Sequence, residues 1–355
     1  MAAKSGRVQE VLKTSDFDYH LPKELIAQTP VEPRDASRLL VLDRTDGSIQ
    51  HRRFSELGTF LKTGDLLVFN DSRVIPARLH ARRPATQGKV ELLLLRRLKP
   101  GVWQALARPA RRLRPGSRLE IVGDDTGCDV QVVAKDEAGS LTVRLSDEGV
   151  IERCGQAPLP PYITEPLADP ERYQTVYARE RGSAAAPTAG LHFTPELMAR
   201  LGEQGIGAAF LTLHVGLDTF RPVDEDDPAQ HAIHGEYAVL PEDAARQINE
   251  TRAAGGTVVA VGTTSVRVLE TAAKAAAESV VEPYVGWTDM FILPGHRFRA
   301  VDALITNFHL PRSTLLMLVS ALAGRDLIMR AYAEAVAERY RFYSFGDAML
   351  IGRPT

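Results

Sequence analysis

The chain has 355 residues, of which 44% are hydrophobic and 25% are charged, and its formal net charge is −2. This composition is typical of a globular protein with a full core, and the length allows more than one domain. No apolar run approaches the roughly 18 residues needed to cross a bilayer, which excludes a membrane-spanning helix. The opening MAAKSGRVQEVLK lacks the apolar centre of a signal peptide, so we expect no export and a cytoplasmic location.

The cysteines indicate the redox compartment of the protein, and the basic residues indicate a class of partner. Cys128 and Cys154 are the only cysteines, and their spacing matches no zinc or redox motif, which favours a reducing compartment. The segment from Ser72 to Arg118 holds thirteen Lys or Arg residues and one acid, Glu91. A basic cluster in a near-neutral chain predicts contact with phosphates, although a solvated β-surface gives the same pattern.

The first half of the chain changes its pattern at about residue 77. Before that point, 38–43 and 66–69 have the apolar pattern of strands, and 54–61 resembles a short helix. Beyond it, short alternating runs are separated by Pro-Gly and acidic turns, which predicts a small antiparallel barrel or sandwich of about five strands. These runs cover residues 90–95, 103–107, 119–122, 130–134 and 141–145.

The second half returns to strands that alternate with helices. Strands are predicted at 208–215, 237–240, 257–261 and 303–306, each followed by a helical pattern or a polar loop. The fold class is therefore α/β, with a discontinuous larger α/β domain (a mixed sheet or a barrel-like sheet) of residues 1–76 and 156–355. Residues 77–155 would form an inserted small antiparallel β-barrel, and 158–163 would be the linker that returns from it.

The stretch 173–193, YQTVYARERGSAAAPTAGLHF, is the least ordinary part of the sequence. Its small residues from Ser183 to Gly190 would let the backbone approach another group closely. It ends on His192, and Thr194-Pro195 then provides an N-cap and a proline at the first position of a helix. A ligand site and a tight crossover that only packs explain this pattern equally well.

Polar side chains follow three of the predicted strands. His214 ends one strand, Thr263-Thr264-Ser265 follows another, and a third leads into Thr306, Asn307 and His309. Because ligands of α/β proteins bind beyond the carboxyl ends of strands, these residues form a candidate site. The start of the helix after residue 262 could also bind an anion, although simple threonine capping is an equal alternative.

Rival sites have weaker patterns. His231, His234 and Glu236, with His214 as a fourth ligand, could hold a metal, but their spacing is not HExxH. Residues 182–184 lack the GxSxG spacing of a serine hydrolase, and no strand is followed by GxGxxG.

Several long motifs resemble those of one known family. The phrases DFDYHLPKELIAQTP, GDLLVFNDSRVIPARL, YQTVYARERGSAAAPTAGLHFT, TLHVG, VGTTSVRVLE, TDMFILPG, ITNFHLPRSTLLMLVSA and YRFYSFGDAMLI are similar to those of the S-adenosylmethionine:tRNA ribosyltransferase-isomerases of queuosine biosynthesis. Departures are small. Asp218 stands where the family has glycine, and Ile233 and Gly235 stand where it has Met and Ser.

The resemblance implies a transfer of the ribosyl group of S-adenosylmethionine to 7-aminomethyl-7-deazaguanine at the wobble position of a tRNA. The products would be epoxyqueuosine-tRNA, adenine and methionine. The family uses S-adenosylmethionine as a co-substrate and needs no tightly bound cofactor and no metal. It is also described as an α/β domain with an inserted β-barrel, which agrees with the pattern of this chain.

The same resemblance suggests roles for the candidate residues. A base is needed to remove a proton from C5′ of the ribose, and His192, His214 and His309 are the candidates for this catalytic role. Thr188 or Asn307 would assist departing adenine. The start of the helix at 262–265 and either Asp289 or Asp302 would bind the methionine carboxylate and ammonium. The full set of expected substrate-binding residues is Thr188, Ala189, Gly190, Phe193, Thr263, Thr264, Ser265, Asp289, Asp302, Asn307 and Phe308.

The expected partners are S-adenosylmethionine and the anticodon loop of a tRNA, with the wobble base splayed out, and we expect the protein to act as a monomer. The basic segment would contact tRNA phosphates through Arg73, Arg78, Arg108, Arg111, Arg112 and Arg114. Two other functions fit parts of the sequence. A non-catalytic RNA-binding protein would use the basic β-module, and a metal-dependent hydrolase would use the histidine loop.

The basic segment leads to a first prediction. Replacing Arg111, Arg112 and Arg114 together with alanine should weaken tRNA binding and reduce the slope of log K against log salt. Each lost phosphate contact should lower that slope by about 0.7–0.9. Equilibrium binding at several salt concentrations measures it, and an unchanged slope would remove these arginines from the interface.

Overall fold

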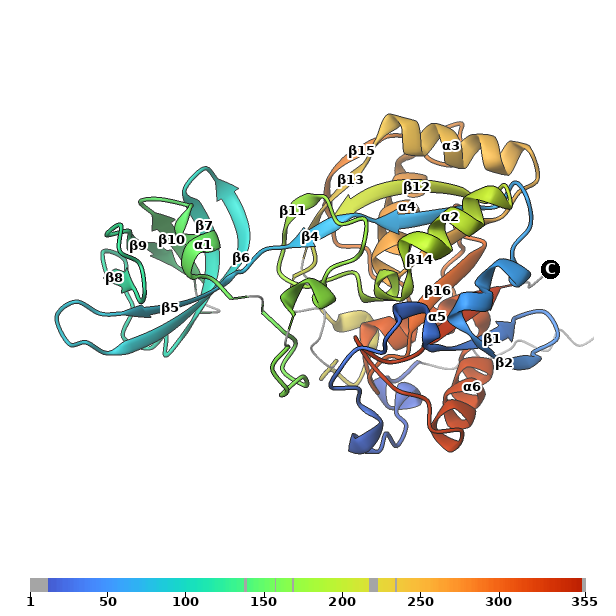
Figure 1. The fold of residues 1–355 in the computed structure, drawn as a ribbon, viewed down its shortest axis with the longest axis horizontal. Coiled ribbons are helices and arrows are strands. Elements are labelled where there is room, and N and C mark those ends of the chain that lie inside the picture. The colour runs from blue at the N-terminus through green and yellow to red at the C-terminus, as the bar shows by residue number, and fades with distance from the viewer. Residues whose placement is uncertain are drawn as a thin grey trace, which may run out of the picture.

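The computed structural model describes residues 12–136, 139–156, 158–167, 169–216, 223–233 and 235–352. Its larger part is built on a mixed nine-stranded sheet (Figure 1). In spatial order the strands are β15 (Tyr284–Thr288), β13 (Glu236–Leu240), β12 (Gly207–Leu213), β3 (Leu66–Asn70), β14 (Val258–Val261), β16 (Ala303–Asn307), β17 (Ala348–Gly352), β1 (Arg38–Asp43) and β2 (Ile49–Arg53).

The centre of this sheet is parallel and buried on both faces. Strands β12, β3, β14 and β16 run in the same direction, so their carboxyl ends meet at one edge. Every residue of β3, β14 and β16 is buried, which is the pattern expected of a sheet with layers on both faces. One face packs against α3 (Glu242–Ala253), α4 (Thr263–Ala275), α5 (Thr314–Ala323) and α6 (Arg325–Ala337), and the other against α2 (Pro195–Glu203).

Alternation along the strands explains how both faces are filled. In β3, Leu66 and Val68 belong to the core under α3 and α4, whereas Leu67 and Phe69 face α2. Successive side chains of a strand point to opposite faces, so an unbroken apolar run serves two cores at once.

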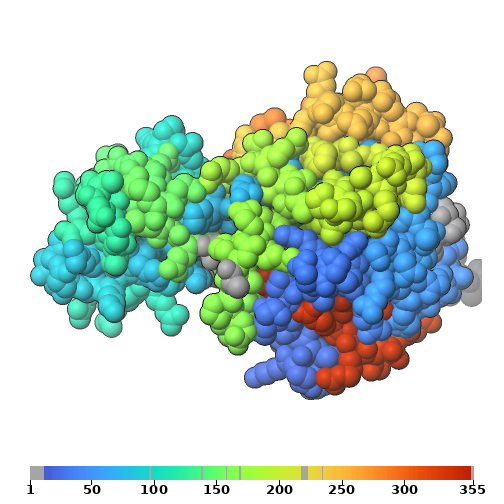
Figure 2. Space-filling model, in the orientation of Figure 1, coloured from blue at the N-terminus to red at the C-terminus, as the bar shows by residue number. Residues whose placement is uncertain are grey.

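A closed six-stranded antiparallel barrel forms a lobe on one side of the larger part (Figures 1 and 2). Its strands are β5 (Arg78–Arg82), β6 (Lys89–Lys99), β7 (Val102–Arg108), β8 (Arg118–Ile121), β9 (Asp129–Lys135) and β10 (Leu141–Leu145). Leu79, Leu92, Leu94, Val130 and Val143 are fully buried in a core of its own. The α/β fold class with an inserted antiparallel barrel is thus confirmed. The sequence pattern missed β5, whose basic residues at alternate positions hide its apolar face.

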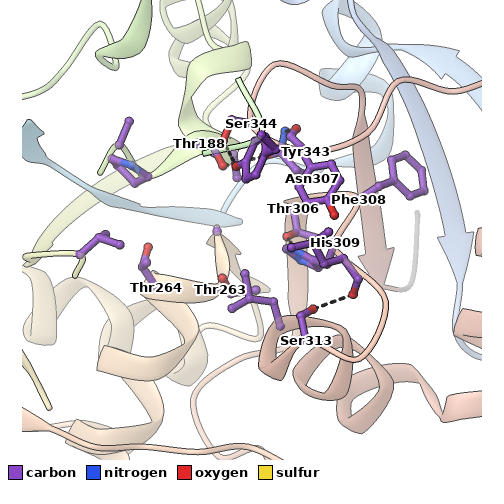
Figure 3. Close-up of a pocket in the computed structure, with 18 residues that line it drawn as sticks. Thr188, Thr263, Thr264, Thr306, Asn307, Phe308, His309, Ser313, Tyr343 and Ser344 are labelled. Carbon is purple, nitrogen blue, oxygen red and sulfur yellow. Dashed lines mark hydrogen bonds between the residues drawn. The ribbon is translucent and has the colours of Figure 1, made fainter. Parts of the chain in front are cut away.

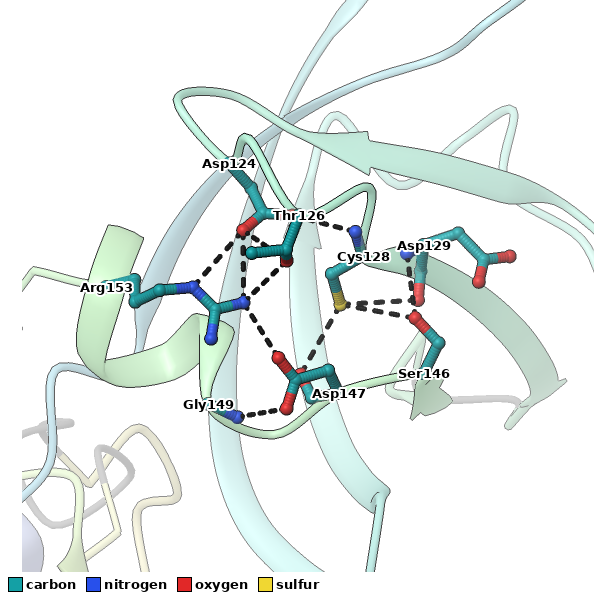
Figure 4. Close-up of polar contacts among 8 residues, drawn as sticks. All are labelled: Asp124, Thr126, Cys128, Asp129, Ser146, Asp147, Gly149 and Arg153. Atoms are coloured by element: carbon teal, nitrogen blue, oxygen red, sulfur yellow. Dashed lines mark hydrogen bonds and ion pairs between the residues drawn. The ribbon is translucent and has the colours of Figure 1, made fainter.

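A network around Arg153 attaches α1 (Val150–Cys154) to the barrel (Figure 4). Its guanidinium Nη2 donates to Asp124 Oδ1 at 3.1 Å, to Asp147 Oδ2 at 2.8 Å and to Thr126 Oγ1 at 2.8 Å. Asp124 also accepts from the backbone N–H of Cys128 at 2.7 Å, and this bond is the first cause that lowers the pKa of the carboxyl. These hydrogen bonds hold the short helix α1 to the barrel, and its Val150 and Ile151 are buried in the barrel core.

Two chain crossings connect the barrel to the sheet. On the way out, β4 (Ser72–Val74) pairs in parallel with β11 (Glu180–Ser183), which belongs to the returning half of the chain. Gln156 and Arg78 exchange backbone hydrogen bonds of 3.0 and 2.9 Å where the chain leaves the barrel. We propose that the domain boundaries lie at these crossings, as the sequence pattern predicts, between residues 76 and 77 and between 155 and 156.

Local signals in the sequence placed most elements correctly. Thr194 caps α2 by accepting from Leu197 N at 3.1 Å, and Ser313 caps α5 by accepting from Leu316 N at 3.1 Å. The predicted helix at 54–61 is a 3-10 helix of Phe54–Phe60. The sequence pattern did not predict β15, which is an edge strand with an exposed face, or β17, a buried five-residue run that directly follows Gly346-Asp347.

Packing at Gly190 yields a second prediction. A Cβ atom at this position would lie 2.0 Å from Tyr177 Oη and 2.8 Å from Thr175 Cγ2. Gly190→Ala should therefore lower the free energy of unfolding by about 1–3 kcal/mol, as overpacking does in cores. Chemical denaturation measures this value. The matched control is Gly202→Ala in α2, where nothing lies within 4 Å, and it should be neutral or stabilising by up to about 1 kcal/mol. Equal effects of the two substitutions would contradict the packing argument.

Candidate functional site

A small cavity of about 70 Å³ lies at the carboxyl edge of the parallel strands. Most of its wall comes from residues 186–189, the turn at 262–264 between β14 and α4, residues 306–310 after β16, and Tyr343-Ser344, and it is completed by Tyr162, Val215, Ser313 and Leu315. Figure 3 shows Thr188, Tyr343 and Ser344 on one side of the cavity and Thr263 and His309 on the other. The structure thus brings together the small-residue loop and all three strand ends that the sequence singled out, the one after β12 through Val215.

The turn into α4 presents polar groups to this cavity. Gly262 has a φ of +89°, a conformation that L side chains rarely adopt, and its N–H donates to Ile305 O at 2.8 Å. Thr263 and Thr264 follow at the first turn of the helix and line the cavity. Among the described residues, no side chain caps this helix start, so its first backbone N–H groups and the positive end of its dipole are available to an anion.

Asn307 links three of the lining segments. Its Oδ1 accepts from Thr188 Oγ1 at 3.2 Å, and its Nδ2 donates to Tyr343 O at 3.0 Å and to His192 Nε2 at 3.2 Å. The side chain is 4% exposed, so each of these bonds replaces one to water. The amide is therefore fixed in one orientation at the cavity wall.

His192 lies behind Asn307 and does not line the cavity. Because Nε2 accepts from the Asn307 amide, the proton of the neutral ring is on Nδ1, which donates to Ser37 Oγ at 2.8 Å. The ring stacks on Phe54 with centroids 5.0 Å apart. Burial lowers the pKa of His192 from 6.5 to about 3, so the ring is neutral and both of its nitrogens are engaged.

His309 does line the small cavity. Its Nε2 shares a 2.8 Å hydrogen bond with Thr306 Oγ1, its N–H donates to Tyr332 Oη at 2.9 Å, and its carbonyl accepts from Tyr19 Oη. Burial lowers the pKa of His309 to about 3. This histidine is therefore a neutral, well-held wall residue.

A second cavity of about 670 Å³ adjoins the first, and Leu315 contributes to both walls. One side is the β6–β7 hairpin of the barrel, through Leu95, Leu98 and Trp103, and the other is the edge of the sheet around β12, β13 and β15. The larger cavity is thus a cleft between the barrel and the sheet.

His214, at the end of β12, lies in this cleft. It is half-buried, its ring is 11° from parallel with that of Tyr237 at 6.4 Å, and its Nδ1 is buried with no hydrogen-bond partner among the described residues. Gly182 packs directly against it, since a Cβ there would lie 3.0 Å from the ring. Burial lowers the pKa of His214, and the nearby Asp71 carboxylate opposes that shift.

The side chains proposed as metal ligands do not converge in the described part of the chain. Glu236 pairs with Arg267, and both side chains are 6% exposed. Glu236 also accepts from Gly216 N at 2.8 Å, while His231 bonds to Glu225 at 2.8 Å. His234 lies outside the described residues. No group of three or more His, Cys, Asp or Glu suited to a metal is found among those that the structure describes.

Several predicted site residues lie away from both cavities. Phe193 is a core residue that packs edge-on against Phe54 and Phe69. Ser265 Oγ donates to Val261 O at 2.8 Å and is fully buried. Gly190 packs against the core, as described above.

The two predicted aspartates and Phe308 also differ from expectation. Asp289 is exposed and lines neither cavity. Asp302 precedes β16, at the opposite edge of the sheet from the site, where it pairs with Arg252. The Phe308 segment borders the small cavity, but its ring packs on Tyr332 and Phe342 and points away from it (Figure 3).

Sequence reasoning missed other lining residues. Tyr162, Ser313, Tyr343 and Ser344 line the small cavity, and Arg267 lines the larger one. None follows a predicted strand directly, so the rule that selected strand ends could not find them. Ser313, Tyr343, Ser344 and Arg267 lie in the quoted motifs, which was the one available signal for them, and Tyr162 lies in none of these motifs.

The predicted tRNA-binding arginines divide into two groups. Arg73 pairs with Glu171 at 2.5 Å and Arg78 with Glu91 at 3.9 Å. The others are exposed, and no ion pair involves them among the described residues; they are Arg108, Arg111, Arg112 and Arg114. Arg108 is the last residue of β7 and lies opposite Glu91. The cleft is lined by Trp103 and Gln104, near the start of the same strand. The four exposed arginines therefore lie at and beyond the end of β7 that is remote from the cleft.

The buried histidines lead to a prediction about acid stability. Above about pH 6.5, His192 is neutral in both the folded and the unfolded chain. Between about pH 6.5 and 3 the unfolded chain binds a proton that the folded chain does not, so the free energy of unfolding falls as the pH falls. The slope from one such group is up to about 1.4 kcal/mol per pH unit.

Denaturant unfolding at a series of pH values measures that slope. His192→Asn should reduce the slope in this window, whereas the control His80→Asn, at an exposed position on the barrel, should leave it unchanged. If His192→Asn keeps the full slope, the ring is not the buried neutral group described above.

Known proteins resemble this chain over nearly its whole length. A family model described as queuosine biosynthesis protein matches residues 14–351. A Symbiobacterium thermophilum protein named S-adenosylmethionine:tRNA ribosyltransferase-isomerase is 59% identical over 344 residues, which cover 96% of this chain and 100% of the relative. One of the same name from Moorella thermoacetica is 55% identical over 345 residues, with the same shares covered.

A solved structure is also similar. The crystal structure of an S-adenosylmethionine tRNA ribosyltransferase from Thermotoga maritima is 44% identical in sequence, with a TM-score of 0.56. The match covers 95% of this chain and 100% of that one. No helix among the described residues is long and apolar enough to cross a membrane.

Proposed function

Because the chain belongs to the queuosine biosynthesis protein family, we propose that its two adjoining cavities carry out the S-adenosylmethionine:tRNA ribosyltransferase-isomerase reaction. The enzyme transfers the ribosyl group of S-adenosylmethionine to 7-aminomethyl-7-deazaguanine at the tRNA wobble position and isomerises it. Epoxyqueuosine-tRNA, adenine and methionine are the products. One observation carries this conclusion: a relative of that name is 59% identical over its whole length.

S-adenosylmethionine would occupy the small cavity and extend into the cleft. Pockets for ligands of this size are typically about 300–1,000 Å³, and the small cavity of about 70 Å³ is below that range. The cleft of about 670 Å³ lies within it and shares Leu315 with the small cavity. The helix start at Thr263 and Thr264 is the matching group for the methionine carboxylate, since its N–H groups and dipole favour an anion.

His214 is the best-placed of the three candidate bases. It lies in the cleft and has a buried ring nitrogen without a partner among the described residues, whereas both nitrogens of His192 are engaged. The adjacent sulfonium acidifies the C5′ hydrogens of the ribose. Transfer of one C5′ proton to the imidazole would leave the electron pair of the C–H bond on C5′ and start the loss of adenine.

The modified base of the anticodon loop would enter the cleft from the barrel side. Trp103 of the barrel and Tyr237 of β13 line the two walls, and aromatic rings are the usual partners of unstacked bases. The exposed arginines at 108–114 would contact phosphates farther along the tRNA. We propose that the protein acts as a monomer. We also propose a cytoplasmic location, where a tRNA substrate would be met.

One assay tests the function and the base together. Purified protein is incubated with S-adenosylmethionine and a tRNA that carries 7-aminomethyl-7-deazaguanine, and adenine and methionine are measured by chromatography. Wild-type protein should release both. His214→Gln should reduce the rate by about 10²- to 10⁴-fold, the usual share of a general base.

The control is His20→Gln, at an exposed position that lines neither cavity, and it should keep the wild-type rate. Binding of tRNA without release of adenine would instead favour a non-catalytic RNA-binding protein. A strict requirement for an added metal would favour the hydrolase. Full activity of the His214→Gln variant would exclude His214 as the base.

A further inference from the structure

Tyr343 combines an unfavourable backbone conformation with a place in the wall of the small cavity. Its φ is +72°, which is rare for a residue with a bulky side chain and is found where the surroundings impose it. The carbonyl of Tyr343 accepts from Asn307 Nδ2 at 3.0 Å and from Gly346 N at 2.9 Å, and its N–H donates to Phe308 O at 3.2 Å. Three hydrogen bonds from the site and its flanking turn therefore hold the residue in this conformation.

The ring of Tyr343 is positioned as firmly as its backbone. It stacks on the ring of Tyr162 with centroids 4.4 Å apart and an interplanar angle of 35°. Tyr162 in turn shares a 2.6 Å hydrogen bond with Ser344 Oγ. The ring thus forms part of an aromatic wall next to Asn307 and Thr188 (Figure 3).

The hydroxyl of Tyr343 is unsatisfied. The residue is 5% exposed, and its Oη is buried without a hydrogen-bond partner among the described residues. Burying a hydroxyl without a partner is unfavourable, and a phenylalanine in this position would avoid that cost. Burial also raises the pKa of Tyr343, so the group remains a neutral hydrogen-bond donor.

We propose that Tyr343 is a substrate-binding residue whose hydroxyl donates a hydrogen bond to a ring nitrogen of the adenine of S-adenosylmethionine. The inference rests on the proposed function. Two features select adenine over the rest of the substrate. The Tyr162–Tyr343 wall is aromatic, with its two rings inclined by 35°, and the Asn307 amide lies beside it. The methionine carboxylate, in contrast, matches the helix start at Thr263 on the other side of the cavity.

Tyr343→Phe isolates the hydroxyl, because it keeps the ring and leaves the backbone hydrogen bonds of residue 343 possible. In the adenine-release assay, the KM for S-adenosylmethionine should rise about tenfold, the loss expected for one neutral hydrogen bond. The KM for tRNA should not change. The midpoint of thermal unfolding should stay the same or rise, since the variant no longer buries an unpaired hydroxyl.

Tyr177→Phe is the matched control. The hydroxyl of Tyr177 is also buried without a partner among the described residues, but this tyrosine lines neither cavity. Its removal should leave both KM values unchanged. If the wild type is active and Tyr343→Phe leaves the KM for S-adenosylmethionine unaltered, the inference about Tyr343 is overturned and the proposed function is not. Absence of adenine release from the wild type would overturn the proposed function.

Substrate analogues test which atom is recognised. Three analogues of S-adenosylmethionine each have one adenine ring nitrogen (N1, N3 or N7) replaced by C–H. For two of these analogues, Tyr343→Phe should raise the KM as much as it does for S-adenosylmethionine. For the third analogue the KM should be the same in the variant and the wild type, because that analogue already lacks the acceptor nitrogen. Equal weakening of all three would overturn the assignment to adenine.

Discussion

The amide of Asn307 is the interaction on which the site depends. It lies at the end of β16 and holds Thr188 of the small-residue loop, His192 behind that loop, and the carbonyl of Tyr343. Thr188 and His192 belong to one 3-10 helix, Thr188–His192, and Tyr343 lies far from it in the sequence. Together with the end of β16 they make three segments. Because a buried amide must satisfy both its oxygen and its nitrogen, one side chain fixes the relative position of all three segments.

The burial that orders the site also separates the roles of its histidines. His192 and His309 are enclosed by apolar and hydroxyl-bearing neighbours, and burial keeps both rings neutral. His214 lies where the sheet meets the cleft, so it keeps a ring nitrogen without a protein partner among the described residues. The three histidines thus differ in role according to how much of each ring is enclosed. His309 lines the cavity, His192 supports Asn307, and His214 is the candidate base.

The barrel brings a second surface to the same place. Its β6–β7 hairpin closes one side of the cleft with Leu95, Leu98 and Trp103, while its own core keeps the six strands rigid. Several of its basic residues pair with acids, as Arg82 does with Glu120 at 3.0 Å and Arg118 with Asp129 at 3.7 Å. The basic count of the segment therefore overstates the charge that it offers to a nucleic acid.

The sequence by itself determined the fold class, the nested barrel and most helix starts, because hydrophobic period and capping are local properties. Thr194 and Ser313 cap the helices that the pattern predicted. It also identified the small-residue loop and the residues after β14 and β16 as parts of one site, since parallel strands end at a common edge.

Only the tertiary structure decided which of those residues face the cavity. His192 and Phe193 end the small-residue stretch, but their side chains point into the core. There the His192 ring bonds to Ser37, and both rings pack against Phe54. Tyr343 follows no predicted strand, yet hydrogen bonds from distant segments set its backbone and place it in the wall. A side chain's direction and exposure depend on neighbours from elsewhere in the chain, and these contacts exist only once the sheet and its loops have assembled.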